Sequence, residues 1–215
     1  MIQSRQRFFT ALFWGFFALR YFLLEARAPR CEVIDVFCPL DERIPFREDF
    51  LVFYVAWYIL LIGMHLYTRK ADSIVFLQYS RFLVFAFTLS SVCFLAFPSC
   101  QNLRPDSYPR DNLLTRAVML LHTLDTNTNV CPSEHVLGTL GALAAALHCG
   151  AIPKTGKLSI IFLSFGICLS TVFLKQHSVI DIAAAVPISL VSYHFSFKKS
   201  PYPPEHAPEK CPDLP

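Results

Sequence analysis

Apolar residues along this chain gather in long blocks and rarely alternate with polar ones. Each block is close to the length, about 17–23 residues, that a helix needs to cross a hydrocarbon core of about 30 Å. Six blocks predict transmembrane helices, over residues 8–24, 50–67, 82–97, 133–148, 158–174 and 178–197. Residues 113–124 have helical apolar spacing but are too few to cross, so we expect them to lie along the interface or to cap a site. The predicted fold class is all-α: a polytopic membrane protein with six transmembrane helices and a short interfacial helix.

The composition supports a membrane protein and excludes an ordinary soluble domain of this size. Of the 215 residues, 54% are hydrophobic and only 16% are charged, so a soluble fold would lack polar surface. We expect residues 1–197 to form a single six-helix membrane domain. The proline-rich residues 198–215 are predicted to form a disordered cytoplasmic tail. The bilayer, and not a nucleic acid, is the expected surrounding of the chain, and its oligomeric state is left open.

The eight cysteines predict neither a zinc site nor a disulfide framework. No C-x-x-C pair and no cluster of histidine and cysteine has the spacing of zinc ligands. Several cysteines fall in apolar runs, where small buried thiols are ordinary. Cys31, Cys38, Cys100 and Cys131 lie in or beside segments predicted to be outside. A Cys31–Cys38 or a Cys100–Cys131 bridge therefore stays open.

The basic residues predict the orientation, because cytoplasmic loops carry an excess of lysine and arginine. With the N-terminus inside, the inner segments hold basic residues that few acids oppose: Arg5, Arg7, Arg69, Lys70, Arg81, Lys154, Lys157, Lys198 and Lys199. We expect an integral protein of the plasma or inner membrane with both termini cytoplasmic. Arg20, near the outer end of the first helix, either snorkels to the headgroups or helps to line an anionic site.

Two histidines stand at the starts of predicted helices on the outer side. His177 and Asp181 are four residues apart, so on a helix they share one face. His135 stands at the start of the fourth predicted helix, and Arg104 and Lys175 also fall on the outer face. Polar groups at the edge of a hydrocarbon core cost free energy and are functional candidates by default. The sequence therefore predicts one extracytoplasmic site.

These residue types permit phosphoryl transfer. Neutral His177 can attack phosphorus while Asp181 supports the positive charge that develops on the ring. His135, if protonated, can donate a proton to the departing oxygen. Arg104 and Lys175 offer donors and positive charge to phosphate oxygens.

Two neighbours of His135 are further candidates at this site. The Ser133 hydroxyl and the free N–H groups at the start of the helix can bind phosphate oxygens. Glu134 either caps the helix, where an acid favours the dipole, or contacts a substrate headgroup. No carboxylate cluster suits magnesium, so we expect neither a metal nor a cofactor.

Three motifs resemble those of the type 2 phosphatidic acid phosphatase superfamily. Pro132-Ser133-Glu134-His135 resembles its P-S-x-H motif, residues 170–181 resemble its S-R-x5-H-x3-D motif, and Arg104-Pro105 resembles the end of its K-x6-R-P motif. The segment K-Q-H-S-V-I-D, residues 175–181, more closely resembles the branch that includes inositol phosphorylceramide synthases. The resemblance covers about residues 80–195, which would be the catalytic core. It implies a six-helix membrane fold and a phosphohistidine intermediate on His177, with His135 as the acid and Asp181 as the orienting partner.

The chain departs from this pattern at two phosphate-binding cations. Phe97 stands where the first motif has lysine, and Thr171 stands where the third motif has arginine. Lys175 is a candidate replacement for one cation, and Arg110 or Arg116 for the other.

Three hypotheses follow. The first is a lipid phosphate phosphatase, in which water attacks the phosphohistidine. The second is a lipid phosphotransferase, in which a hydroxyl acceptor attacks and a headgroup is exchanged. Both make a phosphorylated lipid the expected partner. The third is a non-catalytic protein of the same fold, favoured by the two missing cations and opposed by the histidines and aspartate.

Overall fold

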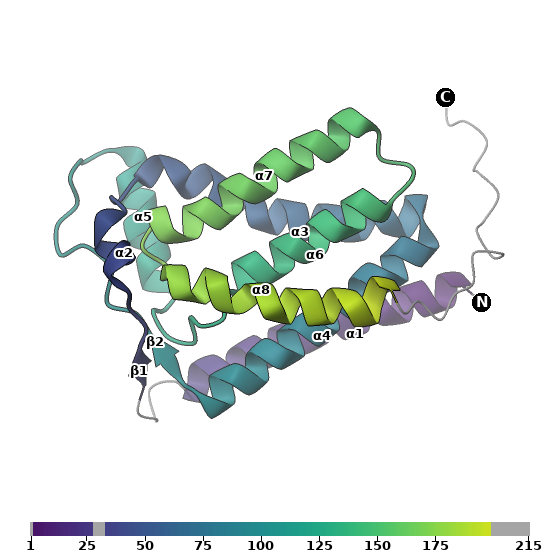
Figure 1. Ribbon diagram of the computed structural model, residues 1–215, viewed down its shortest axis with the longest axis horizontal. Coiled ribbons are helices and arrows are strands. Elements are labelled where there is room, and N and C mark those ends of the chain that lie inside the picture. Colours follow the sequence, from purple (N-terminus) through teal and green to yellow (C-terminus); the bar gives the residue numbers. More distant parts are fainter. Residues whose placement is uncertain (1, 28–32, 199–215) are drawn as a thin grey trace.

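The computed structural model describes residues 2–27 and 33–198. Cys31, one partner in the Cys31–Cys38 bridge that the sequence left open, and the predicted tail apart from Lys198 lie outside these residues. Within them the elements are mainly helical (Figure 1), with the bounds α1 Ile2–Arg27, α2 Pro39–Arg43, α3 Leu51–Ala71, α4 Ser73–Ala96, α5 Leu113–Leu124, α6 Glu134–His148, α7 Lys154–Phe173 and α8 Val179–Tyr193. A 3₁₀ turn, Glu48–Phe50, leads into α3, and a π-helical turn, His194–Lys198, continues α8.

The all-α prediction is confirmed, although one short strand pair was not predicted. Strands β1 (Ile34–Asp35) and β2 (Ser99–Cys100) pair in parallel over two residues, with Ile34 opposite Ser99. This pair ties the segment after α1 to the end of α4. Cys100 and Cys131 are both free thiols, so the Cys100–Cys131 bridge is not formed.

Four helical segments in the described part of the chain are long and apolar enough to cross a membrane. They are residues 48–71, 73–96, 154–173 and 179–198. The six predicted spans are therefore confirmed only in part. Within α1 the described apolar stretch is Trp14–Leu24. Helix α6 has 15 residues, and at about 1.5 Å per residue it covers about 22 Å of a core of about 30 Å.

The predicted loop before the third span is helical, which corrects the sequence analysis. We expected a connection reaching Arg81, but α4 begins at Ser73, directly after the end of α3. Asp72 makes this sharp turn possible, because its side chain accepts hydrogen bonds from the N–H groups of Ile74 (3.1 Å) and Val75 (3.0 Å). Such an N-cap replaces partners that the first turn of a helix lacks.

Helix α6 lies at the centre of the bundle and packs on α3, α4, α7 and α8. Five small residues of this helix are buried: Gly138, Gly141, Ala142, Ala145 and Ala146. At Gly141 an added Cβ would lie 2.5 Å from a ring carbon of Phe82 on α4. The absence of a side chain at this position therefore lets α4 approach α6 closely.

One end of the bundle gathers the elements that matter for a site. Helices α6 and α8 begin at this end and α7 ends there, while α2, α5 and the β1–β2 pair lie across it (left in Figure 1). Two histidines that are 42 positions apart in the sequence, His135 and His177, are thereby brought to the same end of the molecule.

Candidate functional site

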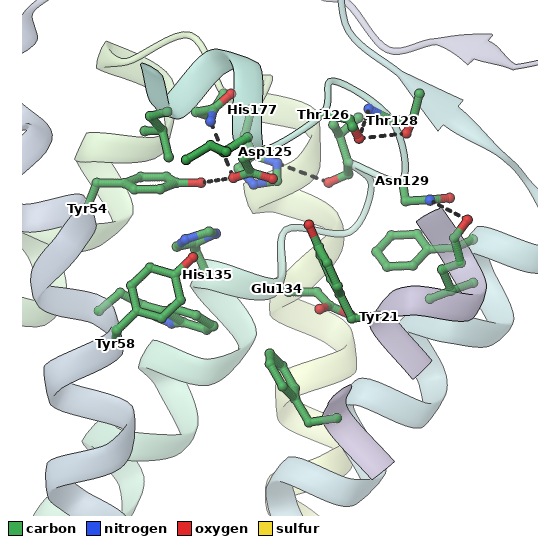
Figure 2. A pocket seen from close by; sticks show the side chains of 18 of the residues that line it. Tyr21, Tyr54, Tyr58, Asp125, Thr126, Thr128, Asn129, Glu134, His135 and His177 are labelled. Carbon is green, nitrogen blue, oxygen red and sulfur yellow. Dashed lines mark hydrogen bonds between the residues drawn. The ribbon is translucent and has the colours of Figure 1, made fainter. Parts of the chain in front are cut away.

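A cavity of about 410 Å³ opens at this end of the bundle. Its wall comes from α1, α3, α4, α5, the α5–α6 loop, the start of α6 and the α7–α8 turn. Figure 2 shows His135, Tyr54 and Tyr58 on one side of it and Glu134 and Tyr21 on the other. The predicted pair His135 and His177 both line it, so the two imidazoles share one pocket.

The His177 ring is held by two acceptors. Its Nδ1 lies 3.1 Å from Asp181 Oδ2 and 3.1 Å from the Val130 carbonyl oxygen. Neither a carboxylate nor a carbonyl oxygen can donate, so the proton must lie on Nδ1. This tautomer leaves a lone pair on Nε2, which is the nitrogen that a nucleophilic histidine needs.

The contact between His177 and Asp181 has a different cause from the one that the spacing suggested. His177 precedes helix α8, so the two residues do not share a helical face. Ser178 is the N-cap, and Asp181 reaches back to accept the Ser178 N–H (2.9 Å) and the His177 ring. This is a capping box, S-x-x-D, that extends by one residue to an imidazole.

His135 faces His177 across the cavity. The two ring centroids are 5.9 Å apart, and the His135 ring lies against those of Tyr54 (4.2 Å) and Trp57 (4.4 Å). Its buried Nε2 has no hydrogen-bond partner among the described residues. A buried polar atom without a partner is rare in folded proteins, and at a cavity it marks a nitrogen available to a ligand.

The starts of α6 and α8 are joined directly. The Ser133 N–H donates to the Asp181 carbonyl oxygen (3.1 Å), which brings the two helix N-termini together beside the histidines. The partial positive charge of both helix ends favours an anion there. The Ser133 hydroxyl is buried without a described partner and is not part of the cavity wall.

Arg104, a predicted phosphate ligand, is directed at the end of α5. Its guanidinium donates to the carbonyl oxygens of His122 (2.6 Å) and Asp125 (2.7 Å) and to Gln176 Oε1 (2.7 Å). Carbonyls at the C-terminus of a helix lack helical partners and favour a cation. The structure therefore gives Arg104 a role in holding α5 and does not bring it to the cavity wall.

Lys175 points away from the histidines. Its Nζ donates to the carbonyl oxygens of Asp41 (2.7 Å) and Ile44 at the end of α2. Its backbone φ of 58° is left-handed, which turns the chain from α7 toward α8. Burial lowers the pKa of Lys175, and the nearby Asp41 opposes that shift. Lys175 joins α2 to the α7–α8 turn and does not line the cavity.

Asp41, which the sequence did not distinguish, completes this connection between α2 and the α7–α8 turn. Its carboxylate accepts the Ser178 hydroxyl (2.6 Å) and the N–H groups of Cys38 (2.8 Å) and Val179 (2.9 Å). Burial alone would raise the pKa of Asp41, but these hydrogen bonds bring it below its ordinary value. Helix α2 thus fixes the backbone next to His177.

Arg110 and Arg116 lie outside the cavity. Arg110 pairs with Glu48 (3.1 Å) near the start of α3, and its side chain is 53% exposed. Arg116 pairs with Asp111 (2.9 Å) and is more exposed still. Neither one replaces a missing cation at the histidines.

Arg20 and Glu134, in contrast, meet at the cavity wall. The two nitrogens Nη1 and Nη2 of Arg20 donate to the two carboxylate oxygens of Glu134, the second at 2.7 Å. Arg20 is only 6% exposed, so it does not snorkel, and it lines the cavity as the other alternative expected. Glu134 does not act as a simple helix cap; it is the partner of this arginine.

Asp125 is a carboxylate of the cavity wall that sequence reasoning missed. Its Oδ2 accepts the Tyr54 hydroxyl (2.6 Å) and the Gln176 amide (3.3 Å), as the upper part of Figure 2 shows for Tyr54. Asp125 stands in a polar loop among threonines and asparagines, and no motif distinguishes it. Its position depends on how α5 ends over the cavity.

The described residues include no group of three or more His, Cys, Asp or Glu side chains that could hold a metal ion. In comparisons with known proteins, no family model, no curated protein and no solved structure matches the chain. The likeness to the phosphatase motifs is therefore a resemblance of short segments. The feature that points to a function is the geometry of the histidine pair at the cavity.

Proposed function

We propose that this chain is a membrane phosphohydrolase that removes phosphate from a lipid phosphate through a phosphohistidine on His177. The observation that carries the proposal is the paired arrangement of His177 and His135 at one cavity, with Asp181 on the far side of the His177 ring. The hydrogen bonds at Nδ1 leave Nε2 of His177 as the nucleophile.

In the first half-reaction, the Nε2 lone pair of His177 forms a bond to phosphorus while the bond from phosphorus to the lipid oxygen breaks. Protonated His135 gives its proton to that departing oxygen. The Asp181 carboxylate balances the positive charge on the imidazole as the N–P bond forms. The N-termini of α6 and α8 add partial positive charge beside the transferring group.

In the second half-reaction, His135 takes a proton from water, and the water oxygen bonds to phosphorus. The N–P bond breaks, orthophosphate leaves, and His177 recovers its lone pair. His135 then carries again the proton that it gave up in the first half. Both histidines therefore return to their starting states.

The membrane setting of this proposal agrees with four helical segments that are long and apolar enough to cross. We propose that α1 and α6 complete a six-helix bundle. We also propose, from the excess of basic residues in the other loops, that the histidine end faces the extracytoplasmic side. A lipid phosphate would then reach the cavity from the bilayer surface.

A transferase reaction is the second candidate, and the polar wall of the cavity favours it. Asp125, Thr126, Thr128 and Asn129 line one side, and hydroxyl and carboxylate groups of this kind can bind the hydroxyls of an acceptor. The first half-reaction would be unchanged. In the second, an acceptor hydroxyl would replace water.

The test uses the purified full chain in detergent with phosphatidate in mixed micelles and no added divalent metal. We expect release of orthophosphate, and we expect His177→Ala to abolish it. His194→Ala is the matched control, because His194 lies at the opposite end of α8 and is exposed, so its loss leaves the activity intact.

Phosphate release that persists in His177→Ala would remove His177 as the nucleophile. Headgroup transfer to an added polyol, without phosphate release, would favour the transferase. If labelled lipid leaves no phosphate on His177 and neither product appears, the chain is not the enzyme proposed.

A further inference from the structure

Among the described residues, Arg20 is the only lysine or arginine that lines the cavity. The sequence suggested four other cations for binding phosphate. Arg104 and Lys175 bind backbone carbonyls, while Arg110 and Arg116 pair with acids outside the cavity. A site that binds a phosphate between two histidines and beside the carboxylates of Glu134 and Asp125 requires a positive charge.

The Arg20 guanidinium is fixed in place by contacts from three helices. Glu134, the residue before His135, receives Nη1 and Nη2, and the Ser90 hydroxyl of α4 donates to the same carboxylate (2.5 Å). The guanidinium carbon lies 5.2 Å from the ring centres of both Phe17 and Phe87. Held in this way, the arginine loses little freedom when a ligand binds.

The guanidinium still has donors to offer. Its Nε is buried and has no hydrogen-bond partner, and Nη2 donates to Glu134 Oε2 alone among the described residues, which leaves its second N–H unused. A planar guanidinium that presents two donors suits two oxygens of one phosphate. A buried ion pair between helices is also weak as a purely stabilising device, because desolvation offsets its attraction.

We propose that Arg20 binds the phosphate group of the substrate, with Glu134 as the side chain that orients its guanidinium. This inference rests on the proposed function, since it assigns the phosphate-binding cation of the same site. Arg20 supplies the charge that Phe97 and Thr171 do not. Glu134 keeps the arginine at the cavity wall when no phosphate is bound.

The experiment uses two kinds of variant, because removal of Arg20 alone leaves Glu134 buried without its partner. Arg20→Lys keeps the charge and removes the planar fork. The double variant Arg20→Met/Glu134→Gln removes both charges together and so avoids an unpaired carboxylate. Arg47→Gln is the control for losing one positive charge, since Arg47 is exposed and pairs with Asp49 away from the cavity.

Two readouts separate phosphate binding from chemistry. The first is kcat and KM for phosphate release from phosphatidate. The second is the affinity for orthophosphate, measured by calorimetry in a His177→Gln background that cannot form the intermediate. We expect both Arg20 variants to weaken orthophosphate binding and to lower kcat/KM by about 10- to 100-fold, as for the loss of charge-assisted hydrogen bonds. We expect Arg47→Gln to change neither.

A double variant that folds, binds orthophosphate as tightly as the parent and keeps its KM would overturn the inference, because Arg20 would then only neutralise Glu134. Arg20→Lys with unchanged affinity would overturn it as well. The proposed function is tested separately. If the parent protein binds orthophosphate through Arg20 but turns over no lipid, the phosphate-binding role of Arg20 holds and the proposed enzymatic function fails. If the double variant keeps full activity, the proposed function holds and the role of Arg20 fails.

Discussion

Asp181 serves His177 in two ways at once, through the proton on Nδ1 and through its negative charge. Its Oδ2 shares the Nδ1 proton with the Val130 carbonyl oxygen, and both acceptors lie at 3.1 Å. The backbone carbonyl alone can therefore keep the tautomer. The charge of the carboxylate has no such substitute, and it matters most when the imidazole becomes cationic in the transition state.

Asp181→Asn separates these two contributions. We expect the Val130 carbonyl oxygen to keep the proton on Nδ1, so substrate binding and KM change little. We expect kcat to fall by about 10²- to 10⁴-fold, because the phosphohistidine and the transition state lose a balancing charge. Steady-state phosphate release measures this. A fall of less than about threefold would mean that the carboxylate only positions the ring.

Some residues of the site could be predicted from the sequence alone and others could not. His135, His177 and Asp181 could be found, because each stands at a helix start next to an apolar run and the S-x-x-D cap is a local pattern. The hydrogen-bond acceptors of Arg104 and Lys175 could not be predicted in this way. Both bind carbonyl oxygens at the ends of α5 and α2, and those ends are close to them only in the folded chain.

At the scale of elements, α5 covers the cavity and is held by a neutral histidine. The Leu174 carbonyl oxygen lies 3.0 Å from His122 Nε2 and can only accept, so that nitrogen carries the proton. The Tyr108 hydroxyl then donates to Nδ1 at 2.8 Å. Burial, and next the charge of Arg104, lower the pKa of His122 from 6.5 to about 4.

This shift predicts a loss of stability in mild acid. Between about pH 6.5 and pH 4 the unfolded chain binds a proton at His122 that the folded chain does not, so the free energy of unfolding falls as the pH falls through this window. Above the window the contribution is fully present. We expect His122→Gln to show a smaller drop in melting temperature between about pH 7.5 and about pH 5. Equal drops in both proteins would contradict it.

Gly141 is the place where the packing of α4 on α6 leaves no room for a side chain. A Cβ there would lie 2.5 Å from the Phe82 ring, whereas a Cβ on Gly63 in α3 meets nothing within 4 Å. We expect Gly141→Ala to lower the free energy of unfolding by about 1–3 kcal/mol through overpacking. Gly63→Ala is the matched control and should be neutral or stabilising, because alanine favours a helix. Thermal unfolding in detergent compares the two.

The elements themselves were predictable to different degrees. Helix α5 was found with its correct bounds, since its amphipathic spacing and the Asn112 cap are local signals. The start of α4 was missed because residues 73–81 contain polar and charged side chains, and their helical state is set by the Asp72 cap and by burial of Phe76 and Tyr79. Helix α2 has five residues, and it owes its position to contacts with the α7–α8 turn.

At the scale of the whole molecule, hydropathy predicts helical segments more reliably than it predicts spans. All six apolar blocks are helical, yet four segments of the described chain meet the length and hydropathy of a membrane crossing. Helix α6 has 15 residues and packs on α3, α4, α7 and α8, and its glycines and alanines are buried in these contacts. Sequence windows cannot distinguish a helix buried in protein from one buried in lipid.

The orientation of the bundle can be tested at its two ends. Asp106 lies in the exposed segment after α4, at the histidine end, and Gly150 lies in the exposed turn between α6 and α7, at the other end. The basic residues near the second end favour the cytoplasm for it. We therefore expect an impermeant thiol reagent to label Asp106→Cys in intact cells and to label Gly150→Cys only after permeabilisation. The parent chain gives the background of the native thiols. The reverse pattern would place the histidine cavity on the cytoplasmic side, so that any lipid phosphate acted on there would have to come from the inner leaflet.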